Sequence, residues 1–123
     1  MYDTLIMLKP EASFTVDQLY ALVMEVVASG EATVERDVEA IRITTDSATL
    51  NIDWNDDAHV IEESHEIAVE FGVPSQGCPA RFEMAGDDPD MDLFNDYLII
   101  NEKLQATGKF VIFDTQEGRL LFD

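Results

Sequence analysis

The spacing of apolar and polar residues along this chain changes several times, and each change predicts a new element of secondary structure. Residues 5–8 form a short unbroken apolar run, which is typical of a strand buried on both faces. From 33 to 54 the two classes alternate, with Val34 and Val38 on the apolar side. This predicts an antiparallel meander with one dry and one wet face. Further strands are predicted over residues 81–84, 110–113 and 119–122.

Three segments instead repeat their apolar residues every three or four positions, which predicts amphipathic helices. The first has a capping box, because Thr15 and Gln18 are spaced so that each side chain meets the backbone N–H of the other. Pro89 stands at the first position of the third helix, where its missing N–H is not needed. The predicted limits of the helices are Thr15 and Gly30, Asp56 or Asp57 and Gly72, and Asp88 and Gly108.

Placed in chain order, these elements read β-α-β-β-β-α-β-α-β-β. We expect an α+β fold with two layers, or partly three, in which three helices pack on a mixed, mostly antiparallel sheet. Residues 1–123 have the size of one globular domain, and 46% of them are hydrophobic. That composition supplies a core without disulfides or metals and argues against a disordered chain.

Charge adds the strongest constraint on function. The chain has 26 aspartates and glutamates against 7 lysines and arginines, for a formal net charge of −19 at pH 7. A surface of this sign repels the phosphates of nucleic acids and anionic membranes, so we expect neither as a partner. It suits a basic protein, a cation or a salt-rich cytoplasm.

Cysteine content and the length of the apolar runs indicate the compartment. Cys78 is the only cysteine, so the chain forms neither an internal disulfide nor a cysteine-rich metal site, and this favours a reducing environment. No basic segment follows Met1, and no apolar stretch approaches the roughly 20 residues of a membrane span. We therefore expect a cytoplasmic protein.

One aspartate-rich segment has part of the pattern of a calcium site. Asp88, Asp90 and Asp92 have the spacing of the first ligands of a calcium loop. Leu93 and Ile99, however, stand where that loop needs glycine and glutamate. The simpler interpretation is a negatively charged start of the third helix, where carboxylates meet the positive end of the helix dipole.

The second predicted helix holds both histidines of the chain. Glu62 and His65 have the Glu-x-x-His spacing that places two metal ligands on one helical face, and His59 lies one turn from Glu63. Di-metal sites use that motif twice, whereas it occurs once here, and no His-Glu-x-x-His sequence is present. His59, Glu62 and His65 are therefore weak metal candidates, which a solvated helix face also explains. We expect no bound cofactor.

Sequence signals for catalysis are weak. Cys78 would need a nearby cation to form a reactive thiolate, and Arg81 is the nearest basic residue in sequence. No serine lies in a Gly-x-Ser-x-Gly turn, and no glycine-rich phosphate loop occurs. These observations favour a protein without enzymatic activity.

The acidic side chains themselves form the leading candidate site. They gather in two segments, 62–70 and 87–96, which would form one broad anionic patch if both lay on the same side of the fold. Such a patch steers and holds a basic protein partner, as in immunity proteins and nucleic-acid mimics. The predicted partner-binding residues are Glu62, Glu63, Glu66, Glu70, Asp87, Asp88, Asp90 and Asp92.

Two other hypotheses follow from the same residues. One is a small metal-binding domain or metal-dependent enzyme that uses the His/Glu cluster of the second helix. The other is a salt-adapted domain whose acidity serves no specific partner, because an acidic, lysine-poor surface is also typical of proteins in a salt-rich cytoplasm.

Overall fold

The computed structural model describes residues 2–10, 12–27, 32–72 and 80–121. They contain ten elements in the predicted order, so the α+β class and the succession of strands and helices are confirmed. The strands are β1 (Tyr2–Leu8), β2 (Thr33–Arg36), β3 (Ala40–Thr44), β4 (Thr49–Asn55), β5 (Arg81–Asp87), β6 (Phe110–Asp114) and β7 (Arg119–Leu120). The helices are α1 (Val16–Val26), α2 (Ala58–Glu70) and α3 (Phe94–Ala106). Gly30 and Cys78 lie outside the described residues.

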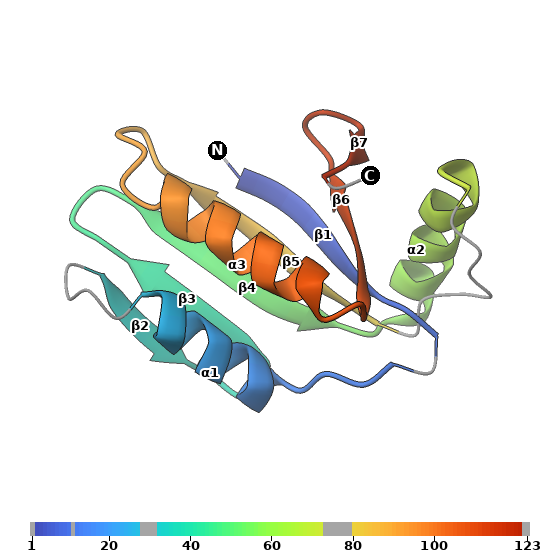
Figure 1. Ribbon diagram of the computed structural model, residues 1–123, viewed down its shortest axis with the longest axis horizontal. Helices are drawn as coiled ribbons and strands as arrows, with labels where there is room; N and C mark the ends of the chain where they lie inside the picture. The colour runs from blue at the N-terminus through green and yellow to red at the C-terminus, as the bar shows by residue number, and fades with distance from the viewer. Residues whose placement is uncertain (1, 11, 28–31, 73–79, 122–123) are drawn as a thin grey trace.

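The strands form one sheet in the order β2-β3-β4-β5-β1-β6-β7 (Figure 1). Every strand pair in the described part of the chain is antiparallel, whereas the sequence suggested a partly parallel sheet. The reason is topological. β5, α3 and β6 form a crossover of the kind that joins parallel neighbours, but β1 lies between β5 and β6 and runs opposite to both.

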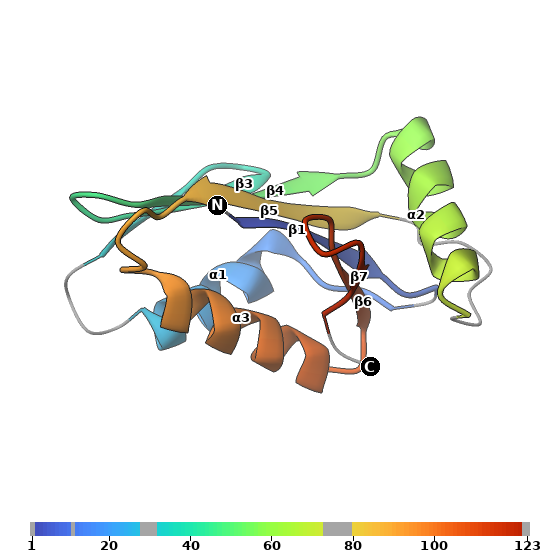
Figure 2. The same cartoon turned by 90° about the horizontal axis from the view of Figure 1, so that it is seen from above.

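Two helices cover one face of the sheet, and the third covers part of the other face. α1 and α3 lie on the same side of the sheet (Figure 2), and Ile6 of β1 belongs to the main core between them and the strands. Leu5 and Met7 point to the opposite face, where Ile67 of α2 packs against them. β1 is thus buried on both faces as predicted, and the fold has two layers with a partial third. None of the described helices is long and apolar enough to cross a bilayer.

The predicted alternation along β2, β3 and β4 is confirmed except at one position. Ile41 is buried under the helices, but Val38 is 81% exposed. Val38 and Glu39 form the two-residue turn between β2 and β3, which a hydrogen bond from the Asp37 N–H to the Ala40 carbonyl closes at 2.8 Å. A side chain at the tip of a hairpin has no core to face, so the prediction for Val38 was wrong.

The start of α3 also differs from the prediction. The helix begins at Phe94 and not directly after Asp88. The Asp88 carboxylate instead accepts hydrogen bonds from the backbone N–H groups of Asp92 (2.7 Å) and Leu93 (2.8 Å), just before the helix. Asp88 therefore fixes the loop that leads into α3, and Pro89 lies outside the helix.

Candidate functional site

The two predicted acidic clusters lie at opposite ends of the sheet (Figure 1). One cluster is on α2, next to the start of β5, and the other follows the end of β5. β5 has seven residues and spans about 20 Å. The condition for one broad anionic patch is therefore not met. The first cluster holds Glu62, Glu63, Glu66 and Glu70, and the second holds Asp87, Asp88, Asp90 and Asp92.

All four glutamates of α2 are exposed, but one of them serves the fold. Glu63 forms an ion pair of 2.7 Å with Arg81, whose side chain is almost completely buried. The Arg81 guanidinium also pairs with Glu83 at 2.7 Å and donates to the Ser64 hydroxyl at 3.2 Å. This network ties α2 to β5, so Glu63 has a structural partner already.

In the second cluster, Asp88 is not on the surface. It is 6% exposed and accepts a hydrogen bond of 2.5 Å from the Tyr2 hydroxyl. Burial raises the pKa of Asp88, but the hydrogen bonds from Tyr2 and from the N–H groups of Leu93 and Asp92 outweigh it and hold the pKa below its usual value. Asp87, Asp90 and Asp92 are exposed, and Asp92 accepts from the Ser47 hydroxyl at 2.5 Å.

The weak metal candidates on α2 do not form a ligand set. His59 and Glu62 are exposed, whereas His65 is half-buried. In the part of the chain that the structure describes, no three His, Cys, Asp or Glu side chains gather closely enough to hold a metal ion. The buried His65 Nδ1 has no hydrogen-bond partner among these residues.

A surface at the β2–β3 hairpin has the properties of a binding site. The exposed Val38 and the half-buried Trp54 line a groove of about 370 Å³, which Phe14 and Val16 border from the start of α1. A second hollow of about 410 Å³ adjoins it and is also lined by Val38 and Trp54. We call this surface the hairpin patch. It comprises Phe14, Thr15, Val16, Asp17, Arg36, Asp37, Val38, Glu39, Ala40, Asp53 and Trp54.

The position of Trp54 follows from the end of β4. Trp54 lies on the buried face of the strand and packs edge-on against Phe82, with 5.0 Å between ring centroids. It is the last inward-facing residue before β4 ends, so the core covers the ring incompletely. Its backbone N–H donates to the Glu39 carbonyl at 2.8 Å, which holds the hairpin turn beside the ring.

Four carboxylates line the same hollows as Val38 and Trp54. Asp17, Asp37, Glu39 and Asp53 are all exposed. Arg36 is the only basic residue that lines the patch, and its guanidinium is paired with Asp17. The patch therefore has a surplus of negative charge around an apolar centre.

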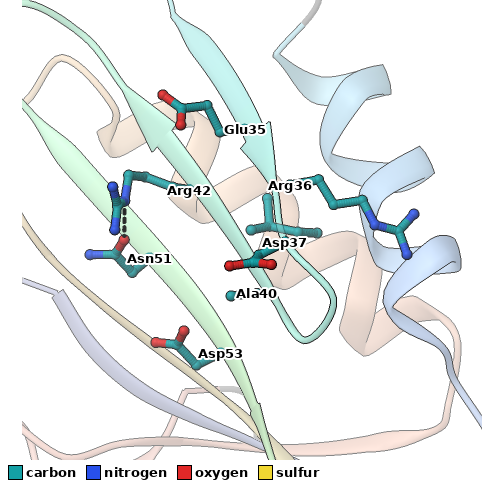
Figure 3. A pocket seen from close by; sticks show the side chains of 8 residues that line it. Glu35, Arg36, Asp37, Ala40, Arg42, Asn51 and Asp53 are labelled. Carbon is teal, nitrogen blue, oxygen red and sulfur yellow. Dashed lines mark hydrogen bonds between the residues drawn. The ribbon is translucent and has the colours of Figure 1, made fainter.

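The acidic surface continues onto the open face of the sheet (Figure 3). A hollow of about 170 Å³ lies at Ala40, whose short side chain leaves space between Asp37 and Asp53. Arg42 is directed to Asn51, whose side-chain oxygen accepts from Nε at 3.0 Å, and Arg36 points toward α1. Within the described residues, neither arginine forms an ion pair with Asp37 or Asp53.

Sequence reasoning missed the hairpin patch because the alternating pattern assigned Val38 to the core. The available signal was the tripeptide Asp37-Val38-Glu39, an apolar residue between two acids at the junction of two alternating runs. Such a junction is where a hairpin turns, and a turn exposes its side chains. The only tryptophan of the chain, Trp54, closes the last of these runs.

Comparison with protein-family models, with curated protein sequences and with solved structures gives no match for this chain. The chemistry of the site is therefore the basis for a functional assignment. The residues that line the hairpin patch and the hollow at Ala40 include no histidine, cysteine or serine. An apolar centre with charged side chains beside it is a composition typical of protein contact surfaces.

Proposed function

We propose that this protein is a non-enzymatic, acidic interaction domain whose hairpin patch binds a basic protein. The observation that supports the proposal is the exposed Val38 beside Trp54, in a hollow that Asp37, Glu39 and Asp53 also line. Binding energy in protein interfaces concentrates in a few apolar or aromatic residues that a polar rim shields from water. An inhibitor of the immunity-protein or nucleic-acid-mimic type uses a surface of this chemistry.

Charge supports a basic partner in two ways. The net charge of −19 attracts a cationic protein over long range and raises the rate of association. At short range, Asp37, Glu39 and Asp53 supply acceptors for lysine or arginine side chains around the apolar contact. The exposed Glu62, Glu66 and Glu70 on α2 extend this negative field. The single cysteine suits a reducing cytoplasm, where we expect the partner to be met.

The experiment has two steps. The immobilised protein first captures basic proteins from the source cell at low salt, and calorimetry then measures the affinity of each purified partner. Val38→Ser is expected to weaken binding about tenfold or more, because it removes the apolar centre of the contact. Val69→Ser is the matched control, because Val69 is also exposed (58%) but lies on α2.

Charge variants separate steering from contact. Asp37→Asn and Glu39→Gln are expected to slow association and reduce its salt dependence, whereas Asp90→Asn, at the far end of β5, should change both less. A partner that binds Val38→Ser as tightly as the wild type, or the absence of any basic partner, would contradict the proposal.

A further inference from the structure

β2 is an open edge of the sheet. In the described sheet it pairs with β3 alone, and three of its four residues are exposed. An unpaired edge presents backbone N–H and C=O groups, to which an extended segment of another protein adds as a further strand. The edge also adjoins the hairpin patch, because Arg36 ends β2 and its side chain lines that patch.

The register of the hairpin identifies the free backbone groups. The Asp37 N–H donates to the β3 carbonyl that closes the turn, and antiparallel partners alternate between bonded and non-bonded pairs. Glu35 is therefore bonded to Arg42, while Val34 and Arg36 direct their N–H and C=O groups away from β3. These groups have no backbone partner among the described residues.

The side chains of β2 determine which side chains an added strand should have. A residue opposite Glu35 lies on the open face, beside a carboxylate that forms no ion pair among the described residues. Arg42 stands across from Glu35 on β3 but donates to Asn51 instead. Residues opposite Val34 lie on the other face, against a half-buried valine. The first position therefore favours a basic side chain and the second an apolar one.

We infer that an extended segment with alternating basic and apolar residues adds antiparallel to β2. The inference rests on the proposed function, because it states how the basic partner is held. A second copy of this chain does not fit the same edge. It would bring another Glu35 and a further net charge of −19 against the first copy.

Short peptides of alternating valine and lysine, blocked at both ends, are the probe. In this arrangement the valine N–H groups bond to β2, and the lysine N–H groups point away from it. N-methylation of the valines is expected to weaken binding about tenfold or more, because it removes backbone hydrogen bonds. N-methylation of the lysines leaves those bonds intact and is the matched control. Calorimetry with the wild-type protein measures both peptides.

Val34→Pro tests the same edge from the protein side. It removes one outward N–H without touching the bonds between β2 and β3, and edge strands tolerate proline. We expect about tenfold weaker peptide binding for Val34→Pro and a smaller loss for Val34→Ala, which keeps the N–H and gives up only part of the apolar contact. In hydrogen exchange, the peptide should newly protect the amides of Val34 and Arg36, whereas the Glu35 amide is already bonded.

The outcomes separate this inference from the proposed function. Equal binding of the two methylated peptides, or no binding of the unmethylated peptide at low salt, would overturn the strand addition. Loss of partner binding in Val38→Ser but not in Val34→Pro would also reject the edge, while keeping the hairpin patch as the binding surface. Normal partner binding by Val38→Ser would reject the proposed function itself.

Discussion

Tyr2 donates its phenolic hydroxyl to the Asp88 carboxylate at 2.5 Å, across 86 positions of sequence. The Tyr2 ring stacks on Tyr97 with 4.4 Å between centroids, and the Tyr97 hydroxyl shares a hydrogen bond of 2.6 Å with Thr4. These four residues join β1, the loop after β5 and α3. All four residues are buried, so each of their hydroxyl and carboxylate groups needs its hydrogen-bond partner within the protein.

Asp88 is expected to stabilise the protein at neutral pH and to lose that effect in acid. Its hydrogen bonds hold its pKa below the ordinary aspartate value of about 4. The contribution is therefore complete above about pH 4 and disappears as the pH falls through the lower, folded-state pKa. Asp88→Asn should lower the free energy of unfolding by about 1.5–3 kcal/mol at pH 7, because hydrogen bonds to a charged group are lost. Urea unfolding at several pH values measures this.

Two comparisons make the acid experiment specific. Asp90→Asn changes an exposed aspartate of the same loop and should alter stability by less than about 0.5 kcal/mol. Burial raises the pKa of Asp96, so protonation of Asp96 in acid favours the folded state. Because wild type and Asp88→Asn both contain Asp96, this effect cancels in the comparison between them. A difference between wild type and Asp88→Asn that does not shrink in acid would contradict the assigned role of Asp88.

The free energy of unfolding should also fall in alkali, because the buried phenols of Tyr2 and Tyr97 ionise more readily in the unfolded chain than in the folded protein. Burial, followed by the hydrogen bond to Asp88 and its charge, raises the pKa of Tyr2. Burial likewise raises the pKa of Tyr97. A raised folded-state pKa means that the stabilisation is complete below the unfolded value of about 10 and is lost as the pH rises above it. Tyr2→Phe should therefore reduce the loss above pH 10, whereas Tyr20→Phe, outside this cluster, should retain it.

Local signals in the sequence predicted the elements well. At the start of α1, the Thr15 hydroxyl accepts from the Gln18 N–H at 3.1 Å, and the Gln18 side chain accepts from the Thr15 N–H at 2.8 Å. This capping box needs only residues three apart, so the sequence contains the whole signal. The same holds for the periodicity of the strands, since it depends on neighbouring residues alone.

Relationships between distant residues could not be predicted in the same way. Asp88 has the sequence features of a helix cap, yet its carboxylate also accepts from the Tyr2 hydroxyl, 86 positions away. The insertion of β1 between β5 and β6 depends on pairing over most of the chain length. For the same reason, the sequence showed two acidic clusters but not that β5 separates them. At Val38 a single turn residue broke an otherwise correct alternation and concealed the candidate site.

Gly86 should resist replacement because two strands meet closely there. A Cβ atom at this position would lie 2.0 Å from the Thr49 carbonyl oxygen and 2.9 Å from the Leu50 Cα, both of which are backbone atoms. Gly86→Ala should therefore force β4 and β5 apart and lower the free energy of unfolding by about 1–3 kcal/mol or more. Gly108→Ala is a useful comparison. Gly108 has open space around it but a positive φ of 73°, so only about 1 kcal/mol of backbone strain is expected. Equal stability of Gly86→Ala and wild type in urea unfolding would show that the strands adjust.

The glutamates of α2 should oppose folding at low salt. Glu62, Glu66 and Glu70 are spaced four residues apart, so they line one side of the helix, and like charges at this spacing repel one another. Glu66→Gln should therefore raise the free energy of unfolding by about 0.2–0.5 kcal/mol per relieved pair at low salt. The gain should shrink at physiological salt, where the screening length is about 8 Å. Urea unfolding across a salt series measures the effect, with Gln105→Glu on α3 as a charge-adding comparison.

A wild-type protein that unfolds at low ionic strength and folds only in molar salt would instead favour a salt-adapted domain without a specific partner. The alternative outcome is that the protein folds at low salt, and that Glu66→Gln both stabilises it and weakens its binding to a basic partner. That outcome would show that the acidity serves binding at the expense of stability.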